Sequence, residues 1–149
     1  MAHRDDATRE RLRSVGLRIT KQRLAVLRWL GQHPHASADQ IVAAVRAELG
    51  SVSTQAVYDV LHACVDGGLV RRIETAGHPA QFETRVQDRH HHLVCRGCGR
   101  TEDVDYTVGD TSCLEPTMEA GFVIDEAEVI FWGYCSVCQA QNDERHASA

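Results

Sequence analysis

Aromatic residues are scarce in this chain of 149 residues, since Phe, Trp and Tyr together make up 5% of it. We therefore expect hydrophobic cores built mainly from aliphatic side chains. Long apolar runs are also missing, and no stretch approaches the roughly 20 apolar residues that a membrane-spanning helix requires. The charged opening residues, MAHRDDATRERLRS, lack the pattern of a secretory signal peptide. These absences predict a cytoplasmic protein that makes no use of a membrane.

Acidic and basic residues are unevenly distributed, although the net charge is only −5. Residues 1–30 contain eight Arg or Lys and three Asp or Glu. Residues 86–149 contain four Arg or Lys and twelve Asp or Glu. Such a division favours two units with different partners, phosphates for the basic end and cations for the acidic end. Two solvated surfaces would show the same charges, so the asymmetry alone does not decide.

The first part of the chain has helical periodicity. A short basic helix is expected at residues 7–15. Three further helices are expected to begin after residues that commonly cap helix N-termini, which are Thr20, Ser37 and Ser53. Residues 69–75 and 80–86 then alternate like two short strands around AGHP, a turn sequence. Helices followed by a hairpin are the order of a winged helix-turn-helix domain, which we expect to occupy residues 1–84.

The second part is expected to be a small α/β unit at residues 90–140, after a polar linker at 85–89. One strand should lead into the first cysteine pair, followed by a strand near 101–106 and a helix near 111–120. A long strand at 122–135 should then lead into the second cysteine pair. Residues 141–149 have the composition of a disordered tail. The predicted fold class is therefore α+β.

Six cysteines in a chain expected to be cytoplasmic point to metal binding before disulfides. Four of them form two Cys-x-x-Cys pairs, at Cys95 and Cys98 and at Cys135 and Cys138. Two such pairs complete a tetrahedral thiolate set, which suits a structural zinc. Cys64 lies on the apolar face of a predicted helix and is expected to be a core residue, whereas Cys113 receives no role.

Three histidines, His90, His91 and His92, precede the first cysteine pair in a predicted strand. Because side chains alternate along a strand, His90 and His92 should lie on one face and could share a metal, with His91 on the other. Further donors nearby are Glu83, Asp103 and Asp105, and His35 stands earlier in the sequence. Such nitrogen and oxygen donors suit Fe(II), Mn(II), Ni(II) or Zn(II). Adjacent surface histidines without a metal are the alternative.

The stretches LRITKQRLAVL, HPHASADQIV, VSTQAVYDVLHACVDGGLV, HHHLVCRGCG and GYCSVC together resemble the ferric uptake regulator family of metal-dependent repressors. TQAVYDVLHAC and DEAEVIFWG resemble an actinobacterial branch associated with catalase genes and the response to peroxide. The resemblance extends from about residue 8 to 140. It implies a cytoplasmic homodimer whose winged helices bind a palindromic DNA operator and whose α/β units dimerise.

The resemblance also implies two metal sites. A structural zinc would be bound by Cys95, Cys98, Cys135 and Cys138. A regulatory metal, Fe(II) or Mn(II), would be bound between the domains by His35, Glu83, His90, His92 and Asp103. Some relatives have another metal site, whose positions here are Arg89, His91, Asp110 and Ala127; arginine and alanine cannot bind a metal, although Glu126 is a possible substitute. Peroxide sensors of the family often have aspartate where this chain has Glu83, which favours iron sensing.

DNA contact is expected from two groups of residues in the winged helix. The start of the fourth helix could reach bases and phosphates through Ser53, Thr54, Gln55 and Tyr58, and the backbone could be held by Arg18, Lys21 and Arg23. Gln55 and Tyr58 would otherwise be exposed residues of a solvent-facing helix.

The predicted function is that of an Fe(II)-loaded, peroxide-responsive repressor of catalase and oxidative-stress genes. Peroxide would oxidise His35 or His90 and release the operator. Regulation of iron or another divalent metal without peroxide sensing is the alternative. A zinc hydrolase is less favoured because the chain lacks an HExxH helix. A zinc-ribbon module that binds proteins would leave the basic winged helix without a purpose.

Overall fold

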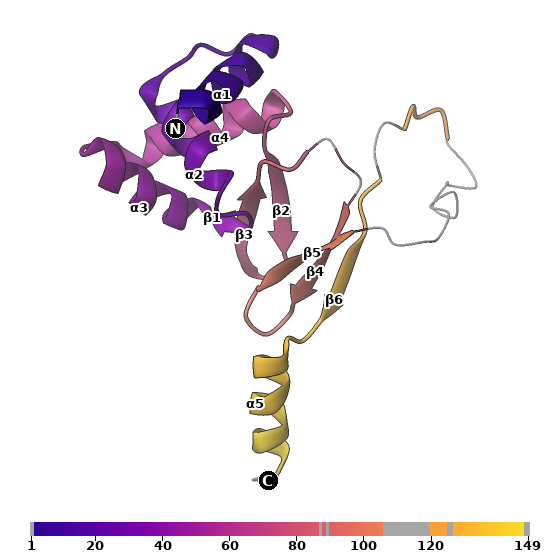
Figure 1. The fold of residues 1–149 in the computed structure, drawn as a ribbon. Helices are drawn as coiled ribbons and strands as arrows, with labels where there is room; N and C mark the ends of the chain where they lie inside the picture. The colour runs from indigo at the N-terminus through magenta and orange to yellow at the C-terminus, as the bar shows by residue number, and fades with distance from the viewer. Residues whose placement is uncertain (1, 87, 89, 106–119, 125–126, 148–149) are drawn as a thin grey trace. The chain divides into compact units, whose positions relative to one another are not determined.

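The computed structural model describes all residues except 1, 87, 89, 106–119, 125–126 and 148–149. The chain divides into two units, Met1–Asp88 and Arg89–Ala149, each of which is described by itself. This division lies within the linker predicted at residues 85–89. Both helices and sheets are present, as Figure 1 shows, and the predicted α+β class is confirmed. No helix among the described residues is long and apolar enough to cross a membrane.

The N-terminal unit contains four helices and a small sheet. The helices are α1 (Ala2–Ser14), α2 (Lys21–Leu30), α3 (Ala38–Leu49) and α4 (Thr54–Asp66). The strands are β1 (Ala36–Ser37), β2 (Arg71–Thr75) and β3 (His78–Glu83), which pair antiparallel in the order β1-β3-β2. This is the winged helix-turn-helix arrangement that the sequence predicted.

The helix starts follow the predicted caps. The Thr20 hydroxyl accepts a hydrogen bond from the Arg23 N–H at 3.2 Å, and the Ser53 hydroxyl accepts one from the Ala56 N–H at 3.0 Å. Ser37 forms a full capping box, because the Gln40 side chain also accepts from the Ser37 N–H at 2.9 Å. Each cap satisfies backbone donors that a helix start would leave unpaired, a contribution of about 1 kcal/mol.

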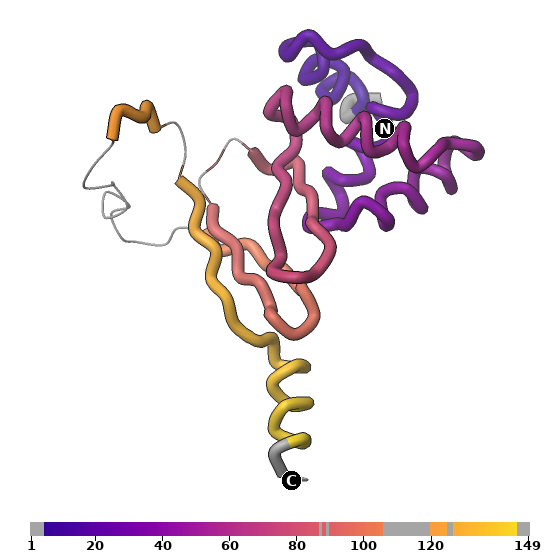
Figure 2. The backbone as a smooth tube through the Cα atoms, turned by 180° about the vertical axis from the view of Figure 1, so that it is seen from behind, coloured from indigo at the N-terminus to yellow at the C-terminus, as the bar shows by residue number. Residues whose placement is uncertain are grey.

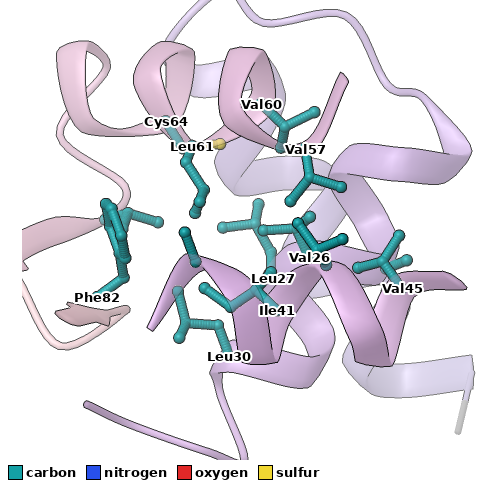
Figure 3. Packing of buried hydrophobic residues seen from close by; sticks show 14 of the residues in the cluster. Val26, Leu27, Leu30, Ile41, Val45, Val57, Val60, Leu61, Cys64 and Phe82 are labelled. Carbon is teal, nitrogen blue, oxygen red and sulfur yellow. The ribbon is translucent and has the colours of Figure 1, made fainter. Parts of the chain in front are cut away.

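The core of the N-terminal unit is aliphatic, as the scarcity of aromatic residues predicted. Figure 3 shows Leu27, Leu30 and Ile41 packed toward Leu61, with Phe82 at the side of the cluster. Cys64 is fully buried in this cluster, and burial raises the pKa of its thiol to about 11. Cys64 is therefore a core residue with an unreactive thiol, as expected. Cys113 lies outside the described residues.

The hairpin differs from its predicted form at the turn. The strand expected to begin at residue 80 begins at His78, and the reversal takes place at Ala76 and Gly77, whose φ angles are 43° and 90°. Positive φ at both central residues matches the right-handed twist of the flanking strands. The two-residue strand β1 was not predicted, because it is too short to show alternation.

The C-terminal unit contains β4 (His90–Cys95), β5 (Thr101–Asp105), β6 (Ile130–Gly133) and α5 (Ser136–Ala147). β4 is the central strand, antiparallel to β5 and parallel to β6. In Figure 1 and in Figure 2, the reverse view, α5 extends away from this sheet beyond the end of β6. Among the described residues of this unit, Val94 and Cys95 are the two buried hydrophobic residues, so it has little core of its own.

Two expectations for this unit were wrong. The long strand predicted at 122–135 is confined, within its described part, to Ile130–Gly133. The disordered tail predicted from residue 141 is helical to Ala147, because α5 begins at Ser136 and continues through Ala, Gln, Glu and Arg, which favour helix. The helix expected near 111–120 lies outside the described residues.

Candidate metal centres and nucleic-acid interface

The four predicted zinc ligands come together at one end of the C-terminal sheet. Cys95 ends β4, Cys98 follows in the turn, Cys135 directly precedes α5, and Cys138 lies in the first turn of that helix. Their sulfur atoms all lie within 4.8 Å of one another. The Sγ atoms of Cys98 and Cys135 are 3.8 Å apart. A tetrahedral zinc with Zn–S bonds near 2.3 Å places its sulfurs at about 3.8 Å from each other, so the cluster fits zinc.

Backbone donors favour a negative charge on this sulfur set. The backbone N–H of Cys135 donates to the Sγ of Cys95 at 3.3 Å, and this hydrogen bond lowers the pKa of the Cys95 thiol to about 6. Cys138 has the opposite tendency, because a side-chain hydrogen bond with Cys135 raises the pKa of its thiol to about 12. Zinc binds thiolates, so its binding displaces thiol protons from the set, and the backbone hydrogen bond favours the thiolate form of Cys95.

Gly97, between the first two cysteines, is packed against the second pair. A Cβ atom at this position would lie 2.8 Å from the Sγ of Cys138 and 3.1 Å from its Cβ. We expect Gly97→Ala to push Cys138 out of the tetrahedral set at a cost of about 1–3 kcal/mol. Zinc transfer to a chromogenic chelator should therefore become roughly tenfold faster or more.

Gly133→Ala is the matched control for this substitution. Gly133 lies on β6 in the same unit, and a Cβ there would meet no atom within 4 Å. Its zinc transfer should match that of the unchanged protein. Equal rates for Gly97→Ala and Gly133→Ala would show that Gly97 does not shape the cluster.

All three histidines lie on β4, and two of them, His90 and His92, share one face as the alternation predicted. The Nε2 atoms of His90 and His92 are 3.2 Å apart, and their rings meet edge to face. Asp103 lies opposite His92 on β5, with its Oδ1 3.8 Å from the Nε2 of His90 and 3.7 Å from that of His92. Both histidines are buried. Two imidazole nitrogens and a carboxylate oxygen thus converge on one point, as a divalent metal requires.

His91 lies on the other face of the strand, as the alternation predicted. Its ring is buried and stands edge-on to Phe131 of β6, with ring centroids 6.0 Å apart. Burial lowers the pKa of His91, and the nearby His90 and His92 lower it further. Of the other positions considered for an additional metal site, Ala127 offers no donor, and Arg89, Asp110 and Glu126 lie outside the described residues.

A pair of donors is assembled within the N-terminal unit. β1 pairs with β3 through Ala36 and Phe82, so the residues that flank this pair, His35 and Glu83, face each other. The Nε2 of His35 lies 3.4 Å from the Oε2 of Glu83, which is buried. His35 has a φ angle of 61°, in the left-handed region that non-glycine residues seldom adopt. Such backbone strain is typical of functional positions.

Sequence reasoning missed two residues beside these donors. Arg71 of β2 lies opposite Glu83, with its Nη1 3.8 Å from the Oε1 of Glu83. In the C-terminal unit, Glu128 lies 3.4 Å from the Nδ1 of His92. The sequence offered no signal for Glu128, because the parallel register between β4 and β6 connects segments separated by more than 30 residues.

The predicted DNA-contacting residues lie at the starts of α4 and α2, and the structure gives several of them local partners. Ser53 caps α4, and the Thr54 hydroxyl accepts from the Arg46 guanidinium at 2.8 Å. Gln55 donates to Asp59 at 2.8 Å along the exposed side of α4. Tyr58 packs against the core with part of its surface.

The basic group precedes and begins α2. The Arg23 guanidinium donates to the backbone oxygen of Arg18 at 2.6 Å, and Arg23 is half-buried. Arg18 and Lys21 are exposed. Ser53, Thr54 and Gln55 at the start of α4 are exposed as well. Exposed polar and basic side chains of these kinds suit phosphates and base edges.

Comparison with known proteins decides the family. The sequence pattern of the ferric uptake regulator family matches residues 14–131. The chain belongs to the ferric uptake regulator family. It is 51% identical over 136 residues to the transcriptional regulator FurA of Mycobacterium tuberculosis, covering 91% of this chain and 92% of that protein. It is 57% identical over 121 residues to ferric uptake regulation protein 1 of Mycolicibacterium fortuitum, covering 81% of this chain and 75% of that protein.

A more distant relative is the peroxide-responsive repressor PerR of Staphylococcus aureus, 30% identical over 130 residues and covering 86% of each chain. Among solved structures, the ferric uptake regulator of Pseudomonas aeruginosa with manganese has a TM-score of 0.71 and 27% identity over 87% of this chain and 98% of that one. The ferric uptake regulator of Helicobacter pylori has a TM-score of 0.73 at 20% identity, over 93% of this chain and 94% of that one. At this identity, the similarity shows the fold alone.

Family membership establishes the class of the protein. It is a metal-responsive transcriptional regulator of a family whose members bind DNA as dimers, and it is not an enzyme. The hydrolase alternative is thereby excluded. The four-cysteine cluster fits a structural zinc, and the related regulator of Pseudomonas aeruginosa was solved with manganese.

Proposed function

We propose that the protein is an Fe(II)-dependent repressor whose regulatory metal is bound by His90, His92 and Asp103 of the C-terminal unit. The observation that carries this proposal is the 3.2 Å approach of two imidazole Nε2 atoms with a carboxylate oxygen 3.7–3.8 Å from both. Nitrogen and oxygen donors suit Fe(II) or Mn(II), whereas the cysteine set suits zinc. The two kinds of metal are thus separated by ligand chemistry.

Two more ligands are proposed from the N-terminal unit, His35 and Glu83. Their approach to 3.4 Å and the left-handed backbone of His35 support this assignment. Ligands from both units would make metal occupancy favour one arrangement of the DNA-binding unit relative to the dimerisation unit. A metal that binds one arrangement more tightly shifts the population toward it.

The proposed output is binding of a homodimer to a palindromic operator. The recognition helices α4 of the two copies would then lie about 34–36 Å apart, which matches successive major grooves on one side of the DNA. Loss of the metal would release this arrangement and the operator. Because its target is DNA, the protein would act in the cytoplasm.

Iron and peroxide are both candidate signals. The names of the 51% and 57% identical relatives, FurA and ferric uptake regulation protein 1, support regulation by iron. The 30% identical PerR supports a peroxide response, which would place catalase and other oxidative-stress genes among the targets. Bound Fe(II) can reduce hydrogen peroxide, and His35 or His90 would then be oxidised and lost as a ligand.

Operator release by peroxide separates the two signals. Protein loaded with Fe(II) or Mn(II) is bound to an operator selected from a random DNA pool and exposed to low peroxide. The peroxide response predicts release from the Fe(II) form alone, with one oxygen atom added to His35 or His90 by mass spectrometry. Release without added oxygen would rule out ligand oxidation and leave loss of iron as the signal. Absence of release would rule out peroxide sensing.

Gln55 provides a test of the DNA interface. Gln55→Ala should lower operator affinity by about 1–3 kcal/mol if its amide contacts a base edge, and should relax sequence preference at one position. Gln32→Ala is the control, because Gln32 is exposed in the turn that follows α2. Equal operator affinities for the two variants, measured by fluorescence anisotropy with the regulatory metal present, would contradict the assignment of Gln55.

A further inference from the structure

The two ring nitrogens of His92 face different partners. Its Nε2 faces the Nε2 of His90 at 3.2 Å and the Oδ1 of Asp103 at 3.7 Å. Its Nδ1 lies 3.4 Å from the Oε1 of Glu128. This distance is slightly longer than a standard hydrogen bond. Glu128 is therefore on the side of the ring opposite the proposed metal.

The strand register explains why Glu128 is there. In the parallel pairing of β4 with β6, His92 lies opposite Ile130, and its N–H donates to the backbone oxygen of Val129 at 3.4 Å. Ile130 shares the face of His92, and Phe131 lies on the opposite face with His91. Glu128 precedes β6 by two residues, and its carboxylate lies on the side of His90 and His92.

A carboxylate at Nδ1 determines which nitrogen of a neutral imidazole carries the proton. The proton is favoured on Nδ1, where the carboxylate accepts it in a hydrogen bond, and the lone pair is then on Nε2. A histidine that binds a metal through Nε2 requires this tautomer. Carboxylates that accept from the second nitrogen also hold the ring in place and make the bound nitrogen more basic.

We propose that Glu128 is a positioning residue for the regulatory metal, acting through His92. It accepts the Nδ1–H of His92, orients the ring and presents the Nε2 lone pair toward His90 and Asp103. This inference rests on the proposed function of those three residues as metal ligands. Glu128 is not itself a ligand, because the atom that it approaches is the ring nitrogen remote from the other donors. Its side chain is 37% exposed, so its replacement should leave the sheet folded.

The experiment compares Glu128→Ala and Glu128→Gln with the unchanged full-length protein, all containing the structural zinc. The tautomer of His92 is read from ¹⁵N shifts of histidine-labelled protein without a second metal, with the His92 signals assigned by their loss in His92→Gln. The affinity for Co(II), used as the probe, is read from its d–d absorption. Glu102→Ala is the control, because Glu102 is an exposed carboxylate on the same sheet, opposite Leu93 and paired with Arg100.

We expect His92 to be protonated on Nδ1 in the unchanged protein and to become a mixture of tautomers in Glu128→Ala. Co(II) affinity should fall roughly 10- to 100-fold in this variant. Glu128→Gln should recover much of both properties, because its amide oxygen still accepts the Nδ1–H, and Glu102→Ala should change neither. Rescue by glutamine would not be seen if Glu128 served only as a surface charge.

The outcomes separate this inference from the function on which it rests. If the unchanged protein binds Co(II) at the second site and Glu128→Ala does so equally tightly with an unchanged tautomer, the role of Glu128 is wrong and the metal site stands. If the unchanged protein binds no second metal ion, the proposed function itself is overturned.

Discussion

Replacement of Cys135 by serine is expected to remove the structural zinc and to unfold the C-terminal unit, while the N-terminal unit remains folded. Zinc in a site of this kind contributes on the order of 10 kcal/mol to folding. Within the described part of the C-terminal unit, the buried hydrophobic residues are Val94 and Cys95, one of which is itself a ligand. Little else is available to hold β4, β5 and β6 together.

The measurement for Cys135→Ser is amide hydrogen exchange with zinc analysis on the same sample. Protection should disappear from β4 and β5 and persist in α2, α3 and α4, whose own core is large. Cys64→Ala is the control, because it removes a thiol from that core and should lower the stability of the N-terminal unit without loss of zinc. A zinc-free Cys135→Ser protein with a protected β4 would contradict this account.

Replacement of His92 by alanine is expected to abolish the response of operator binding to metal, with the structural zinc retained. The substitution removes one of three donors that converge within the C-terminal unit. Coupling between two sites typically changes the affinity at one of them by about 5- to 150-fold. In His92→Ala, the increase in operator affinity caused by metal should disappear. The measurement is operator affinity by fluorescence anisotropy, with and without Mn(II).

His91→Ala is the matched control for His92→Ala, because it removes an adjacent buried histidine from the opposite face of β4. It should retain most of the metal response after any loss of stability is taken into account. If His91→Ala lost the response and His92→Ala kept it, the assignment of the two faces of β4 would be reversed.

Short-range features of this protein could be predicted from sequence because their causes are local. Thr20, Ser37 and Ser53 cap helices through bonds to residues three positions further on. Cys-x-x-Cys spacing brings two thiolates to one metal, and alternation along a strand separates His91 from His90 and His92. The sequence also offered His35, Glu83, Asp103 and Asp105 as further donors, and the resemblance to the family selected the first three.

Features that depend on pairing between distant segments could not be predicted. His35 faces Glu83 because the two-residue β1 pairs with β3, and a strand of that length leaves no pattern. Glu128 reaches His92 through a parallel register that periodicity does not encode. The helical continuation of α5 was missed because a polar composition suits both a solvated helix and a disordered tail.

The central claim is that a metal at the nitrogen and oxygen donors controls operator binding independently of the structural zinc. The most direct measurement is a titration of zinc-containing protein with Mn(II), in which bound manganese, retained zinc and operator affinity are determined together. We expect one Mn(II) per chain to bind without release of zinc, and operator affinity to rise as that site fills. An operator affinity that is the same with and without bound Mn(II), or that rises only as zinc is displaced, would contradict it.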